Sequence, residues 1–205
     1  MLRWGLCITR SLLGIVEAMI DQALQSVVAE LNQHFVTKYG IDEDRVLLST
    51  LVKPDGGMAL SDENVVVATL IAIERERFAT PKQNATLSVG ETTPIYLNLF
   101  VLFSMYFNER LHGEALKFLS GVIAFFQSKN VFTPQNTSGL DSSFEKLIFE
   151  IRNQTFHEQS NMWSYLGCKY LPSVLFKVRM VMIDEGNIDF QVSGVSGMGP
   201  DLSNQ

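Results

Sequence analysis

The chain has few cysteines: only Cys7 and Cys168 occur among its 205 residues. Two cysteines in apolar and aromatic surroundings form neither a disulfide framework nor a metal-binding box. Disulfide-stabilised secreted scaffolds and cysteine-rich zinc modules are therefore excluded as protein classes. We expect both thiols to be reduced and packed in a cytosolic protein.

Long uninterrupted apolar runs and basic clusters are also missing. Charged residues make up 19% of the sequence and interrupt the apolar stretches, which argues against a membrane protein. The 16 lysines and arginines are scattered and outnumbered by 22 aspartates and glutamates, so the formal charge is −6. Such a chain lacks the basic run that binding to a phosphate backbone requires. We expect neither membrane insertion nor a nucleic-acid partner.

No catalytic or cofactor motif stands out in the sequence. The three histidines, His34, His112 and His157, share no metal-ligand spacing such as H-x-x-x-H. The glycine-rich stretches Gly56-Gly57 and GVSGMG do not lie between a strand and a helix, as a phosphate cradle requires. The sequence therefore predicts no enzyme activity, no cofactor and no metal site.

The two ends of the chain differ from its middle. Residues 1–18 begin like a signal peptide, but Arg10 splits their apolar run and no A-x-A-like cleavage site follows. We interpret them as an N-terminal extension outside the core, or as translation from an upstream start codon. Residues 186–205 are rich in Gly, Ser, Asn and Asp, and we expect a mobile tail in an isolated subunit. Residues 19–185, between these two ends, are predicted to form one domain, since no shift in composition divides them.

The sequence does contain abundant core material, with 46% hydrophobic residues and 14 phenylalanines. Apolar positions recur with the helical period over Ile20–Tyr39 and Leu111–Lys129, which predicts two amphipathic helices. We expect a shorter helix over His157–Leu166, ended by Gly167.

Alternating and β-branched runs predict the strands. The longest extends over Ile95–Phe107 and is expected at the centre of the sheet. The last, Pro172–Ile183, buries its even-numbered positions, and shorter strands are expected over Val46–Val52, Val65–Ile73 and Lys146–Thr155. These elements predict a single α+β domain: a mixed or antiparallel sheet of four to five long strands, with two main amphipathic helices packed on it.

Four consecutive charged residues form a first candidate for contacts with other molecules. Glu74, Arg75, Glu76 and Arg77 directly follow the apolar strand Val65–Ile73. The strand is therefore expected to begin inside the sheet and to project out of it. The charges form either a solvated strand end or an edge that offers alternating charges to a neighbouring subunit.

The aromatic stretch before the last strand is a second candidate. Trp163, Tyr165 and Tyr170 precede Pro172, which opens that strand. Large amphipathic rings of this kind either cover a core or contact a partner. We expect these rings to pack on the core, with Trp163 holding the last strand in place, and partner contacts to lie on edges and loops elsewhere.

Four stretches in order resemble a known family. They are MIDQALQSVVAELN (Met19–Asn32), IYLNLFVLFSMYF (Ile95–Phe107), ALKFLSGVIAFFQSKNVFTPQNT (Ala115–Thr137) and SNMWSYLGCKYLPSVLFKVRMVMI (Ser160–Ile183). In these stretches the chain resembles the cap, or tail-terminator, proteins of phage-tail-like extracellular contractile injection systems, of the antifeeding-prophage and virulence-cassette type. The most specific piece is W-S-Y-L-G followed by Y-L-P-S-V-L-F-K-V-R, which contains Trp163, Tyr165, Tyr170 and Pro172.

The resemblance implies a structural protein that forms a homo-hexameric ring on the distal end of an inner tube, contacts the last sheath layer and stops the growth of both. Its partners would be the inner tube protein and the sheath protein. It would be cytoplasmic during assembly and part of a particle that is released from the cell. Residues 74–77 are the candidate subunit interface. Two alternatives stay open: an adaptor that attaches another component or an effector to the particle, and a small enzyme with an unrecognised site.

Overall fold

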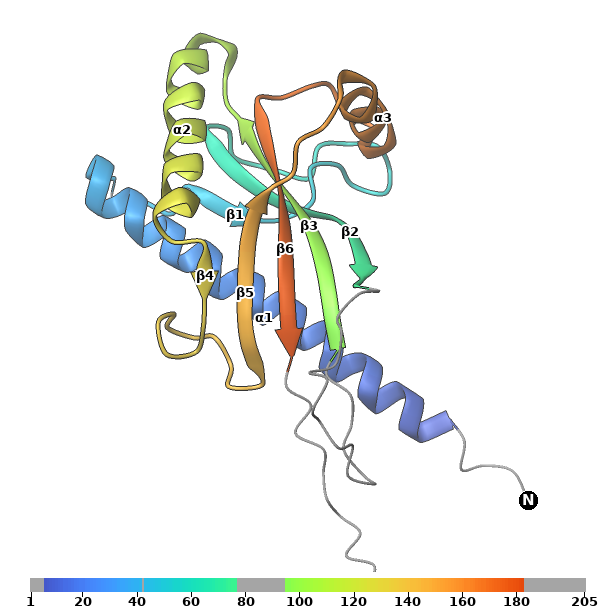
Figure 1. Cartoon of the computed structure of the whole chain (residues 1–205). Coiled ribbons are helices and arrows are strands. Elements are labelled where there is room, and N and C mark those ends of the chain that lie inside the picture. Colours follow the sequence, from blue (N-terminus) through green and yellow to red (C-terminus); the bar gives the residue numbers. More distant parts are fainter. Residues whose placement is uncertain (1–5, 42, 77–94, 183–205) are drawn as a thin grey trace, which may run out of the picture.

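The structure, a computed structural model, describes residues 6–41, 43–76 and 95–182, with side chains described for 20–41, 43–76 and 96–181. Helices and strands of this part of the chain form a mixed α+β domain (Figure 1). The helices are α1 (Leu6–Tyr39), α2 (His112–Ser128) and α3 (Phe156–Leu166), and a 3-10 turn, Glu109–Leu111, precedes α2. The strands are β1 (Val46–Leu48), β2 (Val65–Arg75), β3 (Ile95–Tyr106), β4 (Val131–Phe132), β5 (Phe144–Ile151) and β6 (Ser173–Met182).

The strands form one six-stranded sheet in the order β1-β2-β3-β6-β5-β4. Only β1 and β2 pair in parallel, and the other pairs are antiparallel. The sheet is therefore mixed, and β3 lies at its centre beside β6, as the long alternating stretch predicts. The register across the centre places Phe103 opposite Val174 and Leu97 opposite Met180.

The described residues contain six strands where the sequence predicts four to five long ones, because two of the six are very short. β4 has two residues, too few for any alternation to reveal it. β1 ends at Leu48 rather than Val52, because the chain turns there and buries Leu51 in a different cluster. β5 ends at Ile151 rather than Thr155, since Thr155 caps α3.

α1 is longer than predicted, beginning at Leu6 instead of Ile20. Its C-terminal half buries the predicted apolar stripe, and Leu24, Leu31 and Phe35 are each at most 4% exposed. The helix ends as expected at Gly40, which adopts φ 63° and donates its N–H to the Val36 carbonyl at 2.9 Å. Glycine adopts this left-handed conformation without steric cost.

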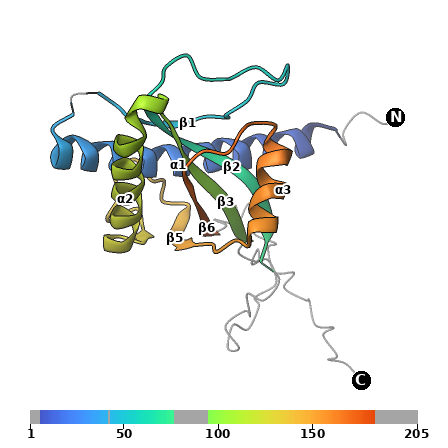
Figure 2. The ribbon, with the colours of Figure 1, turned by 90° about the horizontal axis from the view of Figure 1, so that it is seen from above.

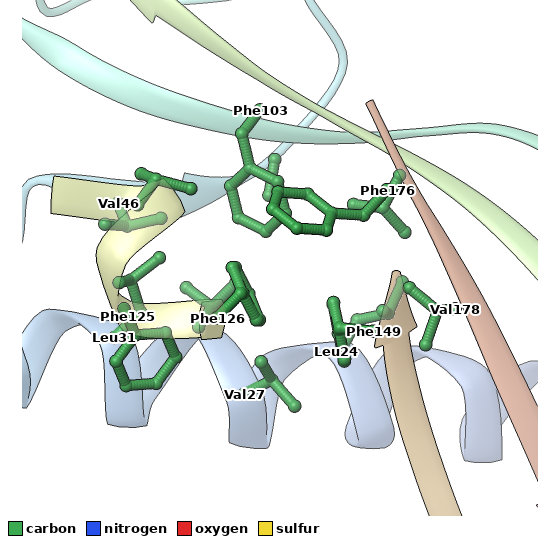
Figure 3. Packing of buried hydrophobic residues seen from close by; sticks show 14 of the residues in the cluster. Leu24, Val27, Leu31, Val46, Phe103, Phe125, Phe126, Phe149, Phe176 and Val178 are labelled. Carbon is green, nitrogen blue, oxygen red and sulfur yellow. The ribbon is translucent and has the colours of Figure 1, made fainter. Parts of the chain in front are cut away.

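The main core lies between one face of the sheet and the helices α1 and α2 (Figure 3). Phenylalanine is its commonest residue type, with nine of the 26 buried residues. The ring of Phe126 stacks on that of Phe149 with 4.4 Å between their centroids, and Phe103 meets Phe176 edge-on at 5.6 Å. Burial of each such ring stabilises the fold by about 1.5–3 kcal/mol. The even-numbered face of β6, with Phe176, Val178 and Met180, belongs to this core, as predicted.

A second, smaller core lies on the opposite face of the sheet. Leu175 is the neighbour of Phe176 on β6 and so points to the other face, where it packs with Met162 and Trp163 of α3. Figure 2 shows α2 and α3 well apart, with β2 and β3 between them in that view. The sheet is thus covered on both faces, but α3 covers only part of the second one.

Candidate assembly surface

The second half of β2 has an open edge. β1 accompanies β2 only as far as Ala68, whose carbonyl accepts a hydrogen bond from the Ser49 N–H at 3.0 Å. From Leu70 to Arg75, no strand in residues 6–41, 43–76 or 95–182 pairs with the side of β2 that faces away from β3. Residues 72–75 are exposed, so β2 leaves the core and projects from it, as the sequence predicts.

The backbone of Ile73 and Arg75 points toward this open edge. The Glu76 N–H donates to the Tyr96 carbonyl at 2.9 Å, which makes these two residues a hydrogen-bonded pair between β2 and β3. Hydrogen-bonded and non-hydrogen-bonded pairs alternate along an antiparallel ladder, so the N–H and C=O groups of Ile73 and Arg75 face away from β3. A row of unpaired backbone groups is a template for an additional strand.

The charged residues at the end of β2 have different surroundings. The Glu76 carboxylate accepts a hydrogen bond from Arg179 Nε on β6 at 2.9 Å, and this bond raises the pKa of the Arg179 guanidinium. Glu76 is therefore engaged within its own chain. Glu74 and Arg75 are exposed, and Arg77 lies outside the described residues.

An apolar groove, which we call the edge groove, runs beside the open edge. Its volume is about 390 Å³, and most of its lining is apolar. Ile73, one of its lining residues, is 48% exposed although it is a large aliphatic residue. The edge groove is lined by residues from α1, from the end of β1 and from β2: Ile20, Asp21, Leu24, Leu48, Ser49, Thr50, Ala68, Thr69, Leu70 and Ile73.

A second groove, the α3 groove, lies on the other face of the sheet, under α3. It has a similar volume of about 390 Å³, an apolar floor that includes Phe100 and Leu175, and a rim with charges of both signs. Its lining residues are Ile71, Ala72, Glu74, Phe100, Arg152, Gln154, Glu158, Asn161, Met162, Tyr165 and Leu175. The exposed end of β2 therefore separates two grooves.

The aromatic residues of the family motif do not share one role. Trp163 is 5% exposed and packs in the second core beside Leu175, as expected for a residue that holds β6 in place. Tyr170 is 60% exposed, but its ring meets that of Trp163 edge-on at 5.7 Å. Pro172 is half-buried, and its carbonyl accepts a hydrogen bond from the Met105 N–H at 2.9 Å.

Tyr165 departs from the expectation that the motif aromatics pack on the core. Its side chain is 80% exposed and lines the α3 groove. The reason is the helical period: Met162 and Trp163 define the buried side of α3, and Tyr165 lies two positions further round the helix. This ring is available for contact with another molecule.

Both ends of α3 are fixed by local hydrogen bonds. Glu158 accepts the Thr155 N–H at 2.7 Å while Thr155 Oγ1 accepts the Glu158 N–H at 3.2 Å, which is a capping box. The N–H of Thr155 also lowers the pKa of the Glu158 carboxyl. Gly167 ends the helix with φ 70°, as predicted.

The titratable residues do not converge on one place. The ring of His34 packs against that of Phe125, with 5.2 Å between their centroids. His112 is the first residue of α2. His157 is exposed on α3, and its Nε2 lies 3.1 Å from Asn161 Nδ2. Burial raises the pKa of the Cys168 thiol and so lowers its thiolate fraction. Within the described ranges, no three His, Cys, Asp or Glu side chains are grouped so that they could hold a metal ion. Nor is any described helix long and apolar enough to cross a membrane.

Sequence analysis missed the edge groove and the exposure of Ile73. The run Val65–Ile73 is apolar except for Thr69, so its period gives no sign that Ile73 itself is exposed. The available signal is the polar pair Ser49-Thr50, which follows β1 and marks the point where the neighbouring strand ends. A short neighbour next to a long strand implies an unpaired edge.

The protein is thus an α+β domain whose sheet has an open edge on β2, with a groove on each side of that edge. Residues 19–196 match the Pvc16 N-terminal domain family. This match covers most of the chain, and the chain belongs to that family. Among curated proteins, none matches the sequence.

Two solved structures share the fold. One is the sheath/tube terminator of an extracellular contractile injection system, PVC, in its extended state, with a TM-score of 0.54 and 13% identity over 91% of this chain. The other is the tube-terminating cap of the anti-feeding prophage, with a TM-score of 0.50 and 12% identity over 88% of this chain. This chain matches only 65% and 60% of the lengths of those two chains. The resemblance to cap and tail-terminator proteins of contractile injection systems is thereby confirmed.

Proposed function

We propose that this protein is a structural cap subunit that ends the inner tube of a contractile injection system, contacts the last sheath layer and stops the assembly of both. The observation that carries the proposal is the shared fold: nearly the whole chain superposes on a sheath/tube terminator and on a tube-terminating cap. Membership of the Pvc16 N-terminal domain family supports it independently of the structure. The role is non-enzymatic, and assembly takes place in the cytoplasm before the particle is released.

The cap is proposed to be a homo-hexameric ring whose subunits meet head to tail. In such a heterologous ring each subunit contributes two different surfaces, and the ring closes without leaving a free one. The projecting end of β2, with Glu74 and Arg75 exposed, is one of these surfaces. Glu76 supports the same surface from within, because its bond to Arg179 ties the end of β2 to β6.

Particles assembled without the protein test the terminator role. Tubes that lack their terminator are expected to vary in length, and the sheath at the distal end is expected to be disordered or lost. Negative-stain electron microscopy measures both the length distribution and the sheath. Supplying the protein in trans should restore uniform particles. Particles of normal length with an intact sheath in its absence would refute the role.

Charge reversal at the end of β2 tests the proposed subunit contact. Arg75→Glu, alone and together with Arg77→Glu, is expected to reduce the hexamer fraction measured by mass photometry, because it places like charges across the contact. Lys117→Glu is the matched control, since Lys117 is an exposed residue of α2 on another part of the molecule. Hexamers that are equally abundant in all variants would exclude this contact.

A further inference from the structure

We infer that the open edge of β2 accepts residues 188–192 of a second copy of this chain as an additional β-strand. The inference deepens the proposed function, on which it rests in one respect: copies of the chain must meet in a ring. It assigns a donor and an acceptor to that contact.

The donor segment has the pattern of a half-buried strand. Ile188, Phe190 and Val192 alternate with Asp189 and Gln191. In an extended strand the three apolar side chains would lie on one face and the polar ones on the other. The family match extends to residue 196, so the segment belongs to the family domain.

The acceptor edge offers what such a strand needs. The N–H and C=O groups of Ile73 and Arg75 point outward, and no described strand pairs with them on that side. The edge groove beside them is apolar, and the Ile73 side chain is 48% exposed. A strand paired here would place its apolar face over Leu24, Leu70 and Ile73 and its polar face toward solvent. Three exposed charges flank the apolar stretch Leu70–Ile73: Asp21 of α1 lines the edge groove, and Glu74 and Arg75 end β2.

The last described residue before the donor segment, Met182, lies at the same end of the sheet as the acceptor edge. Met182 pairs with Ile95, and Arg75 pairs with Leu97, so both lie at one end of β3. Residues 183–187 connect Met182 to the donor segment and span at most about 20 Å when extended. The chain's own open edge lies three strand spacings away, about 14 Å. Length alone therefore does not decide whether the acceptor is the same chain or another.

Topology favours a second copy as the acceptor. β2 ends and β3 begins at this same end of the sheet, and in the strand order both lie between β6 and the position of an added strand. Connections at one end of a sheet seldom cross each other. A segment that paired with its own edge would have to cross from β6 past the chain's link between β2 and β3, whereas a segment that pairs with another copy need not. Each copy would donate one strand and accept one, and this head-to-tail relation closes into a ring.

Mixed disulfide cross-linking tests the assignment directly. In a background with Cys7→Ser and Cys168→Ser, one preparation carries Ile73→Cys and the other Phe190→Cys. Mixing them is expected to give a cross-linked dimer at least 10-fold more abundant than in either preparation alone. Neighbouring donor positions, Ile188→Cys and Val192→Cys, allow for a different register. A chain that carries both cysteines and forms only an intramolecular bond would overturn the second-copy assignment, and no cross-link at any position would overturn the strand pairing.

Two substitutions then separate the strand contact from general instability. For this test the donor cysteine is moved to position 192 (Val192→Cys) and the acceptor cysteine to position 75 (Arg75→Cys). Ile73→Lys places a charge on the acceptor edge, and Phe190→Asp removes the largest apolar side chain of the donor. Each substitution is expected to lower the cross-linked fraction at least 10-fold. Leu116→Lys is the matched control, because Leu116 is also an exposed aliphatic residue, 44% exposed, but lies on α2. A loss with Leu116→Lys as large as with Ile73→Lys would contradict a specific edge.

The same variants distinguish failure of this inference from failure of the proposed function. Particles that end normally although Ile73→Lys and Phe190→Asp are present would refute the strand contact and leave the terminator role intact. Particles of uncontrolled length despite an efficient cross-link would refute the terminator role and leave the strand contact intact.

Discussion

Asn32 on α1 and Val46 at the start of β1 exchange two hydrogen bonds in the interior of the protein. Asn32 Nδ2 donates to the Val46 carbonyl at 2.9 Å, and the Val46 N–H donates to Asn32 Oδ1 at 2.8 Å. The same oxygen accepts the Arg45 N–H at 3.0 Å. Asn32 is 6% exposed, so water cannot readily replace these bonds. One amide side chain thus fixes the short strand whose end leaves the β2 edge open.

Replacing Asn32 with leucine is expected to lower the free energy of unfolding by about 2–4 kcal/mol, because buried backbone groups of Arg45 and Val46 lose their partners. Urea unfolding followed by circular dichroism measures the loss. Gln33→Leu, at the exposed neighbouring position, should change stability by no more than about 0.5 kcal/mol. Equal effects of the two substitutions would show that the buried amide has no special role.

Gly121 on α2 permits close contact with α1. A Cβ atom at this position would lie 2.7 Å from Tyr39 Oη and 3.0 Å from Phe35 Cε1. The tyrosine end can move, but Phe35 is 1% exposed and held edge-on against Phe118.

Gly121→Ala is therefore expected to destabilise the protein by about 1 kcal/mol, although alanine favours helices by up to about 1 kcal/mol. Gly113→Ala, which has open space around its Cβ position, should be neutral or stabilising. Thermal unfolding of the two variants gives the comparison. A stabilised Gly121→Ala variant would mean that the helices separate at little cost.

Elements with a strong local period could be predicted from sequence. The α2 stripe, the alternation of β3 and β6, and the stop of α3 at Gly167 each depend on residues a few positions apart, and the structure confirms them. The projection of β2 was also predictable, because the change from apolar to charged residues occurs within one strand.

Features that depend on distant residues could not be predicted. The pair Glu76–Arg179 joins residues 103 positions apart, and neither residue type specifies the other. Asn32 looks like any polar residue of an amphipathic helix until β1 is placed against it. The exposure of Tyr165 follows from which side of α3 meets the sheet, and a short aromatic helix does not define that side by pattern alone.

The ion pair between Glu76 and Arg179 is expected to contribute less than about 1 kcal/mol, because the Arg179 side chain is 40% exposed. A double-mutant cycle with Glu76→Gln and Arg179→Gln isolates the coupling energy. High salt should weaken the coupling, since solvent screens partly exposed charges. A coupling above about 2 kcal/mol, or one that salt does not change, would indicate a more deeply buried pair.

His34 is expected to make the stability of the protein depend on pH. Burial, with a smaller effect of Lys38, lowers the pKa of His34 below its ordinary value of 6.5. The unfolded chain therefore binds more protons than the folded one just below that value, and the free energy of unfolding falls as the pH drops through it. Urea midpoints between pH 7.5 and 5 should fall less steeply for His34→Gln than for the unchanged protein. Parallel curves would exclude a contribution from His34.

Trp163 and Tyr165 allow packing and partner contact to be separated within one motif. Trp163→Ala is expected to destabilise the protein by about 3–5 kcal/mol, because it leaves a cavity between α3 and β6. Trp163→Phe should cost less, since the indole Nε1 has no hydrogen-bond partner among the described residues. Tyr165→Ala should change stability by no more than about 0.5 kcal/mol, because its ring is 80% exposed.

In particle assembly, the two Trp163 variants test the packing of α3 on β6, whereas Tyr165→Ala tests contact with a partner. If the motif acts only by packing, Tyr165→Ala particles will cap normally, and capping by the Trp163 variants will follow their stability. If the exposed ring contacts tube or sheath, Tyr165→Ala will reduce capping although the protein remains folded. Unfolding curves and particle lengths measured on the same preparations decide between these outcomes, and a large loss of stability in Tyr165→Ala would contradict the placement of that ring outside the core.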